Sequence, residues 1–176
     1  MELKFKKLNP NAILPTRGTP DSAGLDMYAI LPDVSTEMTI LGGSPMTTAV
    51  HQNYKDETAF DQTRCISIPP NRTILIPTGL AVEPSRKDVA LLIYPRSGLA
   101  VKQNIILANC VAVIDSDYRG EIKIPLYNNS NKPVAIYDGD RIAQMVVTPI
   151  LFPAVSETDT LTETIRADGG FGSTGV

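Results

Sequence analysis

Histidine and cysteine are scarce in this chain of 176 residues, which has a single histidine, His51, and two cysteines, Cys65 and Cys110. Two cysteines do not make a disulfide framework, and with one imidazole they cannot supply the usual ligands of a Cys/His zinc site. Ser-His-Asp and Cys-His catalysis would both depend on His51, which follows a polar stretch rich in glycine, serine and threonine. We therefore expect His51 to be a solvated loop residue.

The chain also lacks a basic surplus and any long apolar run. Its formal net charge is −3, whereas a general nucleic-acid-binding protein needs a broad basic face that displaces counterions. The N-terminal sequence MELKFKKLNP has no apolar core like that of a signal peptide, and no segment approaches the length of a membrane span. The sequence predicts a soluble cytoplasmic protein that binds neither nucleic acid nor membrane directly.

Scattered proline and short apolar runs indicate an all-β fold. The 14 prolines interrupt helices at short intervals, which disfavours a helical bundle. Strand-like runs recur about every ten residues, a spacing typical of a β-sandwich or jelly roll. One short helix is expected to begin near Ser97, with the Ser97 hydroxyl as its cap. The predicted strands cover 3–7, 23–29, 72–77, 79–82, 89–94, 105–107, 111–114, 121–127, 134–136 and 142–148.

Two segments depart from this pattern. Residues 34–64 are polar and show no clear period, so they are interpreted as an insertion, in the simplest case a tolerated surface excursion. Residues 166–176 read RADGGFGSTGV, with four glycines, and predict a mobile C-terminal tail. The expected organisation is one β domain over 1–165, with the insertion at 34–64, followed by the tail.

The segment IDSDYRGE contains two carboxylates between strand-like runs. A polar hairpin turn is the simpler explanation of Asp115 and Asp117, and the alternative is a carboxylate at the rim of a sheet that accepts a proton from water. The neighbouring Tyr118 is either a packing residue or a flat face for a ligand ring. The residues alone leave both alternatives open.

Three further segments carry polar groups where a strand begins or ends. In PRSGLA, Arg96, Ser97 and Gly98 suit an anion such as phosphate, although serine is also an ordinary helix cap. In GDRIAQM, Gln144 lies among apolar neighbours and must be satisfied by the fold or directed at a ligand. In AGLDMYA, the Asp26 carboxylate requires a cation such as Arg96 or a hydrated metal.

The tail offers groups that suit a nucleotide. Phe171 stands between glycines, Arg166 precedes it and two hydroxyl residues, Ser173 and Thr174, follow it. A mobile segment with these groups can close over a nucleotide, the ring stacking on a base and the polar groups meeting phosphate.

The order of these segments is more specific than any one of them. AGLDMYA, PRSGLA, VAVIDSDYRGE, GDRIAQM and RADGGFGSTG resemble, in this order, the five motifs of the trimeric deoxyuridine triphosphate nucleotidohydrolases (dUTPases). The resemblance implies a homotrimer of jelly-roll subunits with a swapped glycine-rich tail and three active sites, each shared by all three chains. It implies Mg²⁺-dependent hydrolysis of dUTP to dUMP and pyrophosphate, which keeps uracil out of DNA and supplies dUMP for dTMP synthesis. The location would be the cytoplasm, or the host cytoplasm for a viral member.

The resemblance also assigns roles to individual residues. Asp115 would be the general base that activates water toward the α-phosphorus, and Asp26 would bind Arg96 or a metal-bound water. Phosphate contacts would come from Arg96, Ser97, Gly98 and Gln144, and from Arg166, Ser173 and Thr174 of another subunit's tail. Uracil and deoxyribose contacts would come from Asn109, Val113, Ile114, Tyr118, Lys123, Phe171 and Gly172.

The chain departs from the family pattern at three places. Ala167 replaces a common glycine in the tail, which we expect to matter only if that position needs a positive φ. Ala112 stands where glycine is frequent and slightly narrows the expected base pocket. The 34–64 insertion is the third departure, and its alternative interpretation is a docking arm for a regulatory protein, as in some viral members.

Two other functions are weighed against hydrolysis. A dCTP deaminase on the same fold would carry a catalytic glutamate where this chain has Pro125, which cannot move a proton. A nucleotide-dependent regulatory protein without hydrolysis would have lost the base or the tail, whereas Asp115 and Phe171 are both present. The sequence therefore favours the dUTPase.

Overall fold

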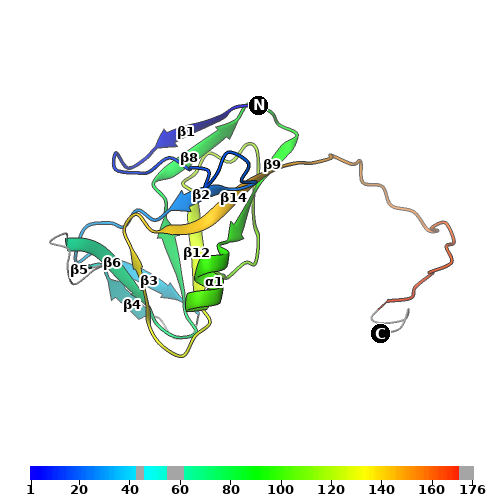
Figure 1. Ribbon diagram of the computed structural model, residues 1–176. Helices are drawn as coiled ribbons and strands as arrows, with labels where there is room; N and C mark the ends of the chain where they lie inside the picture. Colours follow the sequence, from blue (N-terminus) through cyan, green and yellow to red (C-terminus); the bar gives the residue numbers. More distant parts are fainter. Residues whose placement is uncertain (43–45, 55–61, 171–176) are drawn as a thin grey trace.

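The computed structural model describes residues 1–42, 46–54 and 62–170, and within them the chain is a β protein with one short helix, α1 (Ser97–Gln103) (Figure 1). The all-β prediction is thereby confirmed. The strands are β1 (Leu3–Lys7), β2 (Leu25–Tyr28), β3 (Glu37–Leu41), β4 (Met46–Ala49), β5 (His51–Tyr54), β6 (Gln62–Ile68), β7 (Thr73–Pro77), β8 (Leu80–Pro84), β9 (Val89–Pro95), β10 (Ile105–Leu107), β11 (Ala112–Ile114), β12 (Lys123–Asn128), β13 (Val134–Tyr137) and β14 (Arg141–Pro149).

The strands pair antiparallel in four groups, with the orders β1-β8, β10-β12-β7-β3-β4, β11-β9-β14-β2 and β13-β6-β5. Many partners are far apart in sequence, as β2 and β14 are. The group β11-β9-β14-β2 matters most for function, because it places the AGLDMYA, PRSGLA, VAVIDSDYRGE and GDRIAQM segments on neighbouring strands.

The core is aliphatic and follows the strand period of two. Ile74 and Ile76 of β7 and Ile124 and Leu126 of β12 are almost completely buried, and the residues between them point outward. Because side chains alternate between the faces of a strand, this pattern fixes the register of each strand in the sheet. The apolar run of β9 packs its buried residues into the same core.

The helix α1 begins at Ser97, as the sequence predicts, but the expected serine cap is wrong. The N-cap residue is Arg96, with extended backbone angles, and no side-chain hydrogen bond caps the helix. Ser97 is instead the first helical residue, so its hydroxyl lies one position past the place from which a cap acts. No helix among the described residues has the length and apolar character needed to cross a membrane.

The described part of the 34–64 insertion forms strands that the sequence did not predict. The hairpin of β3 and β4 extends the sheet beside β7, and β5 pairs with β6. Ile40 and Val50 are buried in the main core, and the Arg64 guanidinium lies 2.5 Å from the Asp138 carboxylate. This part of the insertion therefore contributes to the core. His51 lies in β5, exposed, so the expected loop is wrong while the solvated side chain is confirmed.

After β14 the chain leaves the body and runs away from it through residues 150–170 (Figure 1). We call this segment the C-terminal arm. From Leu151 onward its large apolar side chains are exposed, almost fully at Leu151, Val155, Leu161 and Ile165 and to 73% at Phe152. Apolar side chains gain free energy when they leave water, so an arm of this composition favours a surface that covers it.

A buried amide joins three parts of the fold. Asn128 of β12 is fully buried, and its Nδ2 donates hydrogen bonds to the carbonyls of Ile68 (2.8 Å) and Lys132 (2.7 Å). Its Oδ1 accepts hydrogen bonds from the backbone N–H and the hydroxyl of Ser130. The side chain thus connects the end of β6 to the loop between β12 and β13.

Replacing this amide with an apolar group of similar size should destabilise the fold. In Asn128→Leu the buried partners lose their hydrogen bonds, and we expect the free energy of unfolding to fall by about 3 kcal/mol. Urea unfolding at one fixed protein concentration measures this change. The neighbouring exposed Asn129 provides the control, since Asn129→Leu should change stability by less than about 0.5 kcal/mol. Equal effects of the two substitutions would contradict the prediction.

Candidate active site

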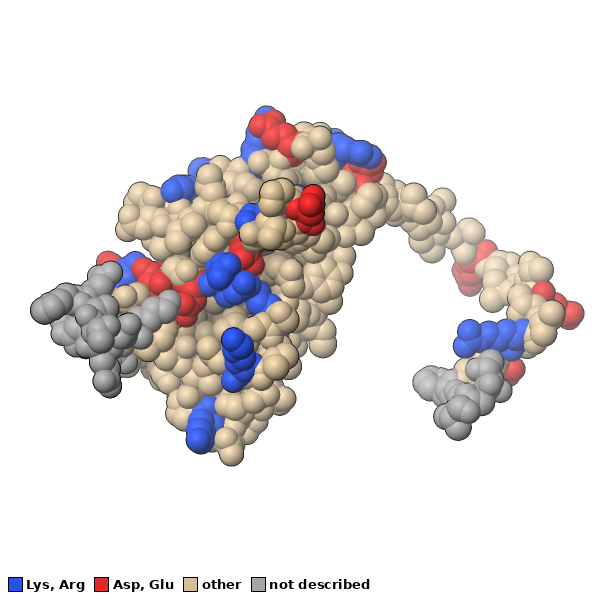
Figure 2. Space-filling model, viewed as in Figure 1, with Lys and Arg blue, Asp and Glu red and all other residues tan. Residues whose placement is uncertain are grey.

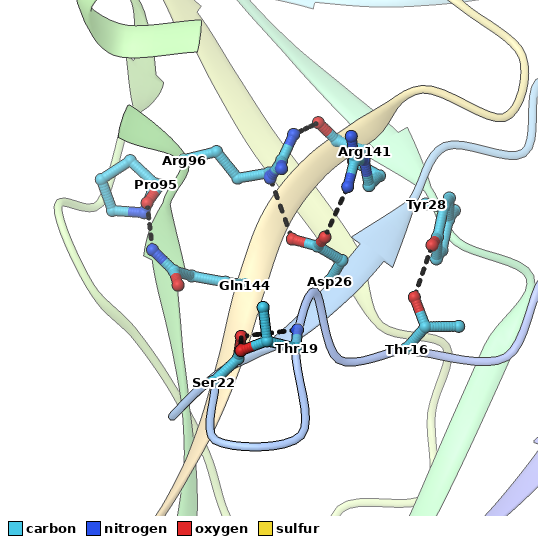
Figure 3. Close-up of polar contacts among 9 residues, drawn as sticks. All are labelled: Thr16, Thr19, Ser22, Asp26, Tyr28, Pro95, Arg96, Arg141 and Gln144. Atoms are coloured by element: carbon cyan, nitrogen blue, oxygen red, sulfur yellow. Dashed lines mark hydrogen bonds and ion pairs between the residues drawn. The ribbon is translucent and has the colours of Figure 1, made fainter. Parts of the chain in front are cut away.

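One partly buried carboxylate gathers two guanidinium groups. Asp26 Oδ1 lies 2.9 Å from Arg96 Nε, and Asp26 Oδ2 lies 3.2 Å from Arg141 Nη1 (Figure 3). The Asp26 side chain is only 13% exposed, and a carboxylate so far from water is stable when cations replace its hydration. Of the two partners expected for Asp26, the structure provides Arg96.

Two further hydrogen bonds order this region. Arg96 Nη1 donates to the Arg141 carbonyl (3.3 Å), and Gln144 Nε2 donates to the Pro95 carbonyl (3.0 Å) (Figure 3). We call Asp26, Arg96, Arg141 and Gln144 the arginine cluster. Its formal charge is +1, which suits an anion.

The first turn of α1 adjoins the arginine cluster. Ser97 and Gly98 follow Arg96 directly and are exposed. A methyl group built at Gly98 would meet nothing within 4 Å, so the chain itself leaves this position open to a ligand. Figure 2 shows Lys and Arg side chains over α1 and the adjoining part of the same face.

A separate cavity of about 180 Å³ lies at the turn between β11 and β12. We call it the hairpin pocket. Five of its lining residues were predicted to bind the substrate or to act as the general base. Ala112, one of the departures from the family pattern, also lines it. The lining residues are Ile93, Ala112, Val113, Ile114, Asp115, Tyr118, Glu121, Ile122 and Lys123. Asn109 was also predicted here, but it lies in the turn before β11 and is not among the lining residues.

The wall of the hairpin pocket is held by backbone contacts. The Tyr118 hydroxyl donates to the Glu121 carbonyl (3.1 Å), so the Tyr118 ring lies across the intervening Gly120. A methyl group at Gly120 would stand 2.3 Å from the Tyr118 Oη, so any residue other than glycine would collide with the tyrosine in this position. The tyrosine is thus fixed by the backbone on which it rests.

Glu121 is a pocket residue that sequence reasoning missed. Its Oε1 accepts a hydrogen bond from the Gly79 N–H (2.9 Å), and its Oε2 lies 3.6 Å from Lys123 Nζ. The partner amide is 42 residues away in sequence, so no local pattern could have indicated it. Glu121 connects the hairpin pocket to the turn between β7 and β8.

Asp115 borders a second and larger cavity of about 780 Å³ as well. This cavity includes the cations Lys4, Lys87 and Arg119. Nearby, Arg86 donates hydrogen bonds to Asp88 and thereby lowers the pKa of that carboxyl. Asp115 itself is exposed, so its carboxylate can reach water from either cavity.

The register of β11 on β9 sets the separation of Asp115 from Arg96 within one chain. Ile114 of β11 is paired with Leu91 of β9, and Arg96 follows Leu91 by five residues. Asp115 continues this register by one residue, so at about 3.3 Å per residue it lies about 20 Å from Arg96, whereas Ile93, which lines the hairpin pocket, precedes Arg96 by only three residues. One chain therefore does not bring its predicted base and its predicted phosphate ligands together.

The tail residues are placed only in part. Arg166 lies in the exposed arm, where its Nε donates to the Gly169 carbonyl (2.9 Å). Ala167 has a positive φ of +45°. Glycine adopts such a φ more readily than alanine, so we expect the replacement of the common glycine to matter here. Phe171, Gly172, Ser173 and Thr174 lie outside the described residues.

The described residues do not fit a resident metal ion. They contain no group of three or more histidine, cysteine or acidic residues that could hold one. Both carboxylate oxygens of Asp26 already face guanidinium groups, so direct ligation would displace an arginine. A role for Asp26 through a metal-bound water stays a prediction.

Arg141 is the member of the arginine cluster that the sequence did not indicate. It is exposed at the start of β14, after a turn, where an arginine ordinarily needs no special explanation. The register of β2 against β14 pairs Arg141 with Tyr28, two residues from Asp26, and this places the two charges together. Only the sheet pairing makes its role visible.

Removing the shared charge of Asp26 should destabilise the chain. In Asp26→Asn, Arg96 and Arg141 lose their common counterion and repel each other, and we expect the free energy of unfolding to fall by about 2 kcal/mol. Denaturant unfolding measures the change. The control is Asp33→Asn, which removes a fully exposed carboxylate 3.5 Å from Arg64 and should cost less than about 0.5 kcal/mol. If Asp26→Asn leaves the free energy of unfolding unchanged, the ion pairs of the arginine cluster do not stabilise the fold.

Comparison with known proteins finds a matching family model and similar sequences. A model of the dUTPase family matches residues 47–175. The chain is 40% identical over 163 residues to the deoxyuridine 5'-triphosphate nucleotidohydrolase of Desulfitobacterium hafniense, which covers 93% of this chain and 87% of that protein. It is 39% identical over 176 residues to the enzyme of the same name from Hydrogenobaculum sp., with 100% and 99% of the two chains covered.

Solved structures agree with the fold. A dUTPase of Staphylococcus bacteriophage 80alpha bound to dUpNHpp matches with a TM-score of 0.73 and 21% identity over 99% of each chain. A dUTPase of phage phi11 of S. aureus, studied for its coordination of a structural Mg(II) ion, matches with a TM-score of 0.68 and 18% identity over 93% of this chain and 100% of that one. These matches confirm the predicted jelly roll.

Proposed function

This chain belongs to the dUTPase family and is a dUTP diphosphatase, and we propose that Asp115 is the general base of its reaction. Water activated by Asp115 attacks the α-phosphorus of dUTP and releases dUMP and pyrophosphate. The observation that carries the proposal is the position of Asp115, an exposed carboxylate at the border of the hairpin pocket and the larger cavity. The reaction would keep uracil out of DNA and supply dUMP.

A lone carboxylate suits this chemistry. Water needs orientation and partial deprotonation, while cationic groups absorb the charge that develops on the triphosphate. Within the described residues, no ion pair engages the Asp115 carboxylate, which is thus free to accept the proton of water. Asp117 lies two residues away on the same turn but does not line the hairpin pocket.

The hairpin pocket would hold uracil and deoxyribose. Backbone groups around Val113 and Ile114 can match the edge of uracil, whereas cytosine reverses the donor and acceptor at one position. Each buried group left unpaired costs about 1–3 kcal/mol, which rejects cytosine. Tyr118, fixed across Gly120, would lie against the deoxyribose and exclude a 2′-hydroxyl.

The arginine cluster would hold the phosphates together with Ser97 and Gly98. Arg96 supplies the charge, and Gln144 retains one amide hydrogen after its hydrogen bond to Pro95. Mg²⁺ bound to the triphosphate would enter with the substrate and neutralise part of its charge.

We infer shared active sites from the separation of Asp115 and Arg96. Along β9 of one chain these two residues lie about 20 Å apart, so an arginine cluster from a second chain would bring its guanidinium groups closer to the Asp115 of the first. The exposed apolar arm would carry Arg166, Phe171, Ser173 and Thr174 to a third. These requirements support the predicted homotrimer.

One expectation, docking of a regulatory protein, stays a prediction, and another, deamination, loses support. Docking of a regulatory protein on the 34–64 insertion stays a prediction, since the phage structures share only the fold with this chain at about one fifth identity. Deamination has no support, because Pro125 of β12 pairs with Leu75 and carries no group that transfers a proton.

Asp115→Asn should abolish hydrolysis and leave dUTP binding largely intact. The amide keeps the shape of the side chain but cannot take a proton from water, so kcat should fall at least about a hundredfold. Pyrophosphate release and calorimetric dUTP binding measure the two quantities. Asp117→Asn is the matched control and should keep normal kcat. Hydrolysis at the wild-type rate by Asp115→Asn would rule out the assignment.

Mixing two inactive variants should restore activity if the sites are shared. Asp115→Asn damages the base, and Arg96→Ala damages the phosphate site, so mixed oligomers would contain some sites with both groups intact. Refolding the two variants together should give activity well above that of either variant refolded alone. No gain from mixing, with mixed oligomers demonstrated by a mass tag, would show that each chain builds its own site.

A further inference from the structure

Gly24 lies directly against the side chain of Gln144. It precedes β2, whose Leu25 pairs with Met145 of β14, the residue after Gln144. A methyl group built at Gly24 would stand 2.9 Å from Gln144 Oε1, 3.2 Å from its Cβ and 3.6 Å from its Cδ. Contacts below 3.0 Å between such atoms do not persist, so a side chain at this position would force Gln144 to move.

The orientation of the Gln144 amide is fixed from two sides. On one side, its Nε2 donates to the Pro95 carbonyl at 3.0 Å (Figure 3). On the other, its Oε1 occupies the space left by the missing side chain of Gly24. An amide nitrogen has two hydrogens, so this orientation leaves one of them for a ligand beside Arg96.

We propose that Gly24 is a positioning residue for the substrate triphosphate, acting through Gln144. By lacking a side chain, it lets the Gln144 amide lie where one N–H is held by Pro95 and the second is directed at a phosphate oxygen. The proposal rests on the phosphate-binding role proposed above for Gln144. It assigns to Gly24 a function in substrate binding beyond the packing of β2 on β14.

Other glycines of the chain separate this effect from a general demand for glycine. Gly18, in the same loop, would place a methyl group 3.5 Å from Ser22 Oγ, an ordinary contact distance. Gly24 has no positive φ, so backbone strain does not enter the comparison. The Gln144 side chain is what limits the space for a side chain at position 24.

The test compares Gly24→Ala, Gln144→Ala and the double variant, with Gly18→Ala as the control. We expect Gly24→Ala and Gln144→Ala each to lower kcat/KM for dUTP at least about tenfold, as befits one lost hydrogen bond to a charged group. The double variant should lose little more than Gln144→Ala alone, because the atoms that clash with the new methyl group are mostly gone. Gly18→Ala should retain the wild-type kcat/KM.

Unfolding measured beside the kinetics separates positioning from packing. If Gly24 only packs, Gly24→Ala lowers the free energy of unfolding but the folded protein keeps its kcat/KM, which contradicts the proposal. Additive losses in the double variant also contradict it, since Gly24 would then act without Gln144. If Gly24→Ala does not fold, the double variant must fold for the proposal to stand.

The same set of variants distinguishes failure of the proposal from failure of the proposed function. Wild-type kcat/KM in Gln144→Ala would show that Gln144 does not bind phosphate, and the role of Gly24 would fail with it. A loss in Gln144→Ala without a loss in Gly24→Ala would overturn the role of Gly24 alone.

Discussion

The arrangement of the candidate site depends on one carboxylate that two arginines share. Asp26 is largely removed from water, and its charge is stable there because Arg96 and Arg141 replace its hydration. These three residues come from β2, the N-cap of α1 directly after β9, and the start of β14, so the ion pairs join three elements at one point. The same contacts hold the guanidinium of Arg96 where α1 begins and leave the cluster with a net positive charge. Stability and anion binding thus come from the same contacts.

The rigidity of β9 determines how the site must be completed. Asp115, which follows β11, and Arg96, which follows β9, lie near opposite ends of this strand, and β11 and β14 hydrogen-bond to its two edges. Side-chain rotation cannot close a gap of about 20 Å in a strand held on both sides. The proposed site would therefore combine the Asp115 of one chain with the Arg96 of another. The C-terminal arm, in which several apolar side chains are almost fully exposed, would be the third element of such an assembly. Activity would then depend on protomer concentration, because folding and assembly are coupled.

Sequence reasoning succeeded where the signal is local. The apolar run of β9, the alternation of β1 and the breaks at proline and glycine placed most strands within one or two residues. It failed in 34–68, where buried Ile40 and Val50 belong to short apolar pairs separated by a polar, glycine-containing stretch, so four strands were missed. The serine cap was wrong because Arg96, held by Asp26, occupies the N-cap position instead.

In the candidate site, too, sequence reasoning found the residues that have a local signal and missed those whose partners are distant in sequence. Asp26, Arg96 and Gln144 were indicated by their own neighbours, as polar groups that need partners in apolar or strand-end positions. Arg141 and Glu121 were missed because their partners, Asp26 and Gly79, come from segments 115 and 42 residues away. A single sequence shows which groups need partners, whereas the register of the sheet decides which partners they receive.

Two glycines show how the backbone itself shapes the site. Tyr118 rests across Gly120, and Gln144 rests against Gly24, and in both places a methyl group would collide with the side chain. A side chain that lies on a backbone strand has few alternative rotamers, so it loses little conformational entropy when a ligand binds. The ring that would contact the sugar and the amide that would contact a phosphate are therefore held before the substrate arrives. In both places the glycine leaves the space and a hydrogen bond to a backbone carbonyl sets the orientation, from the Tyr118 hydroxyl to Glu121 and from Gln144 Nε2 to Pro95.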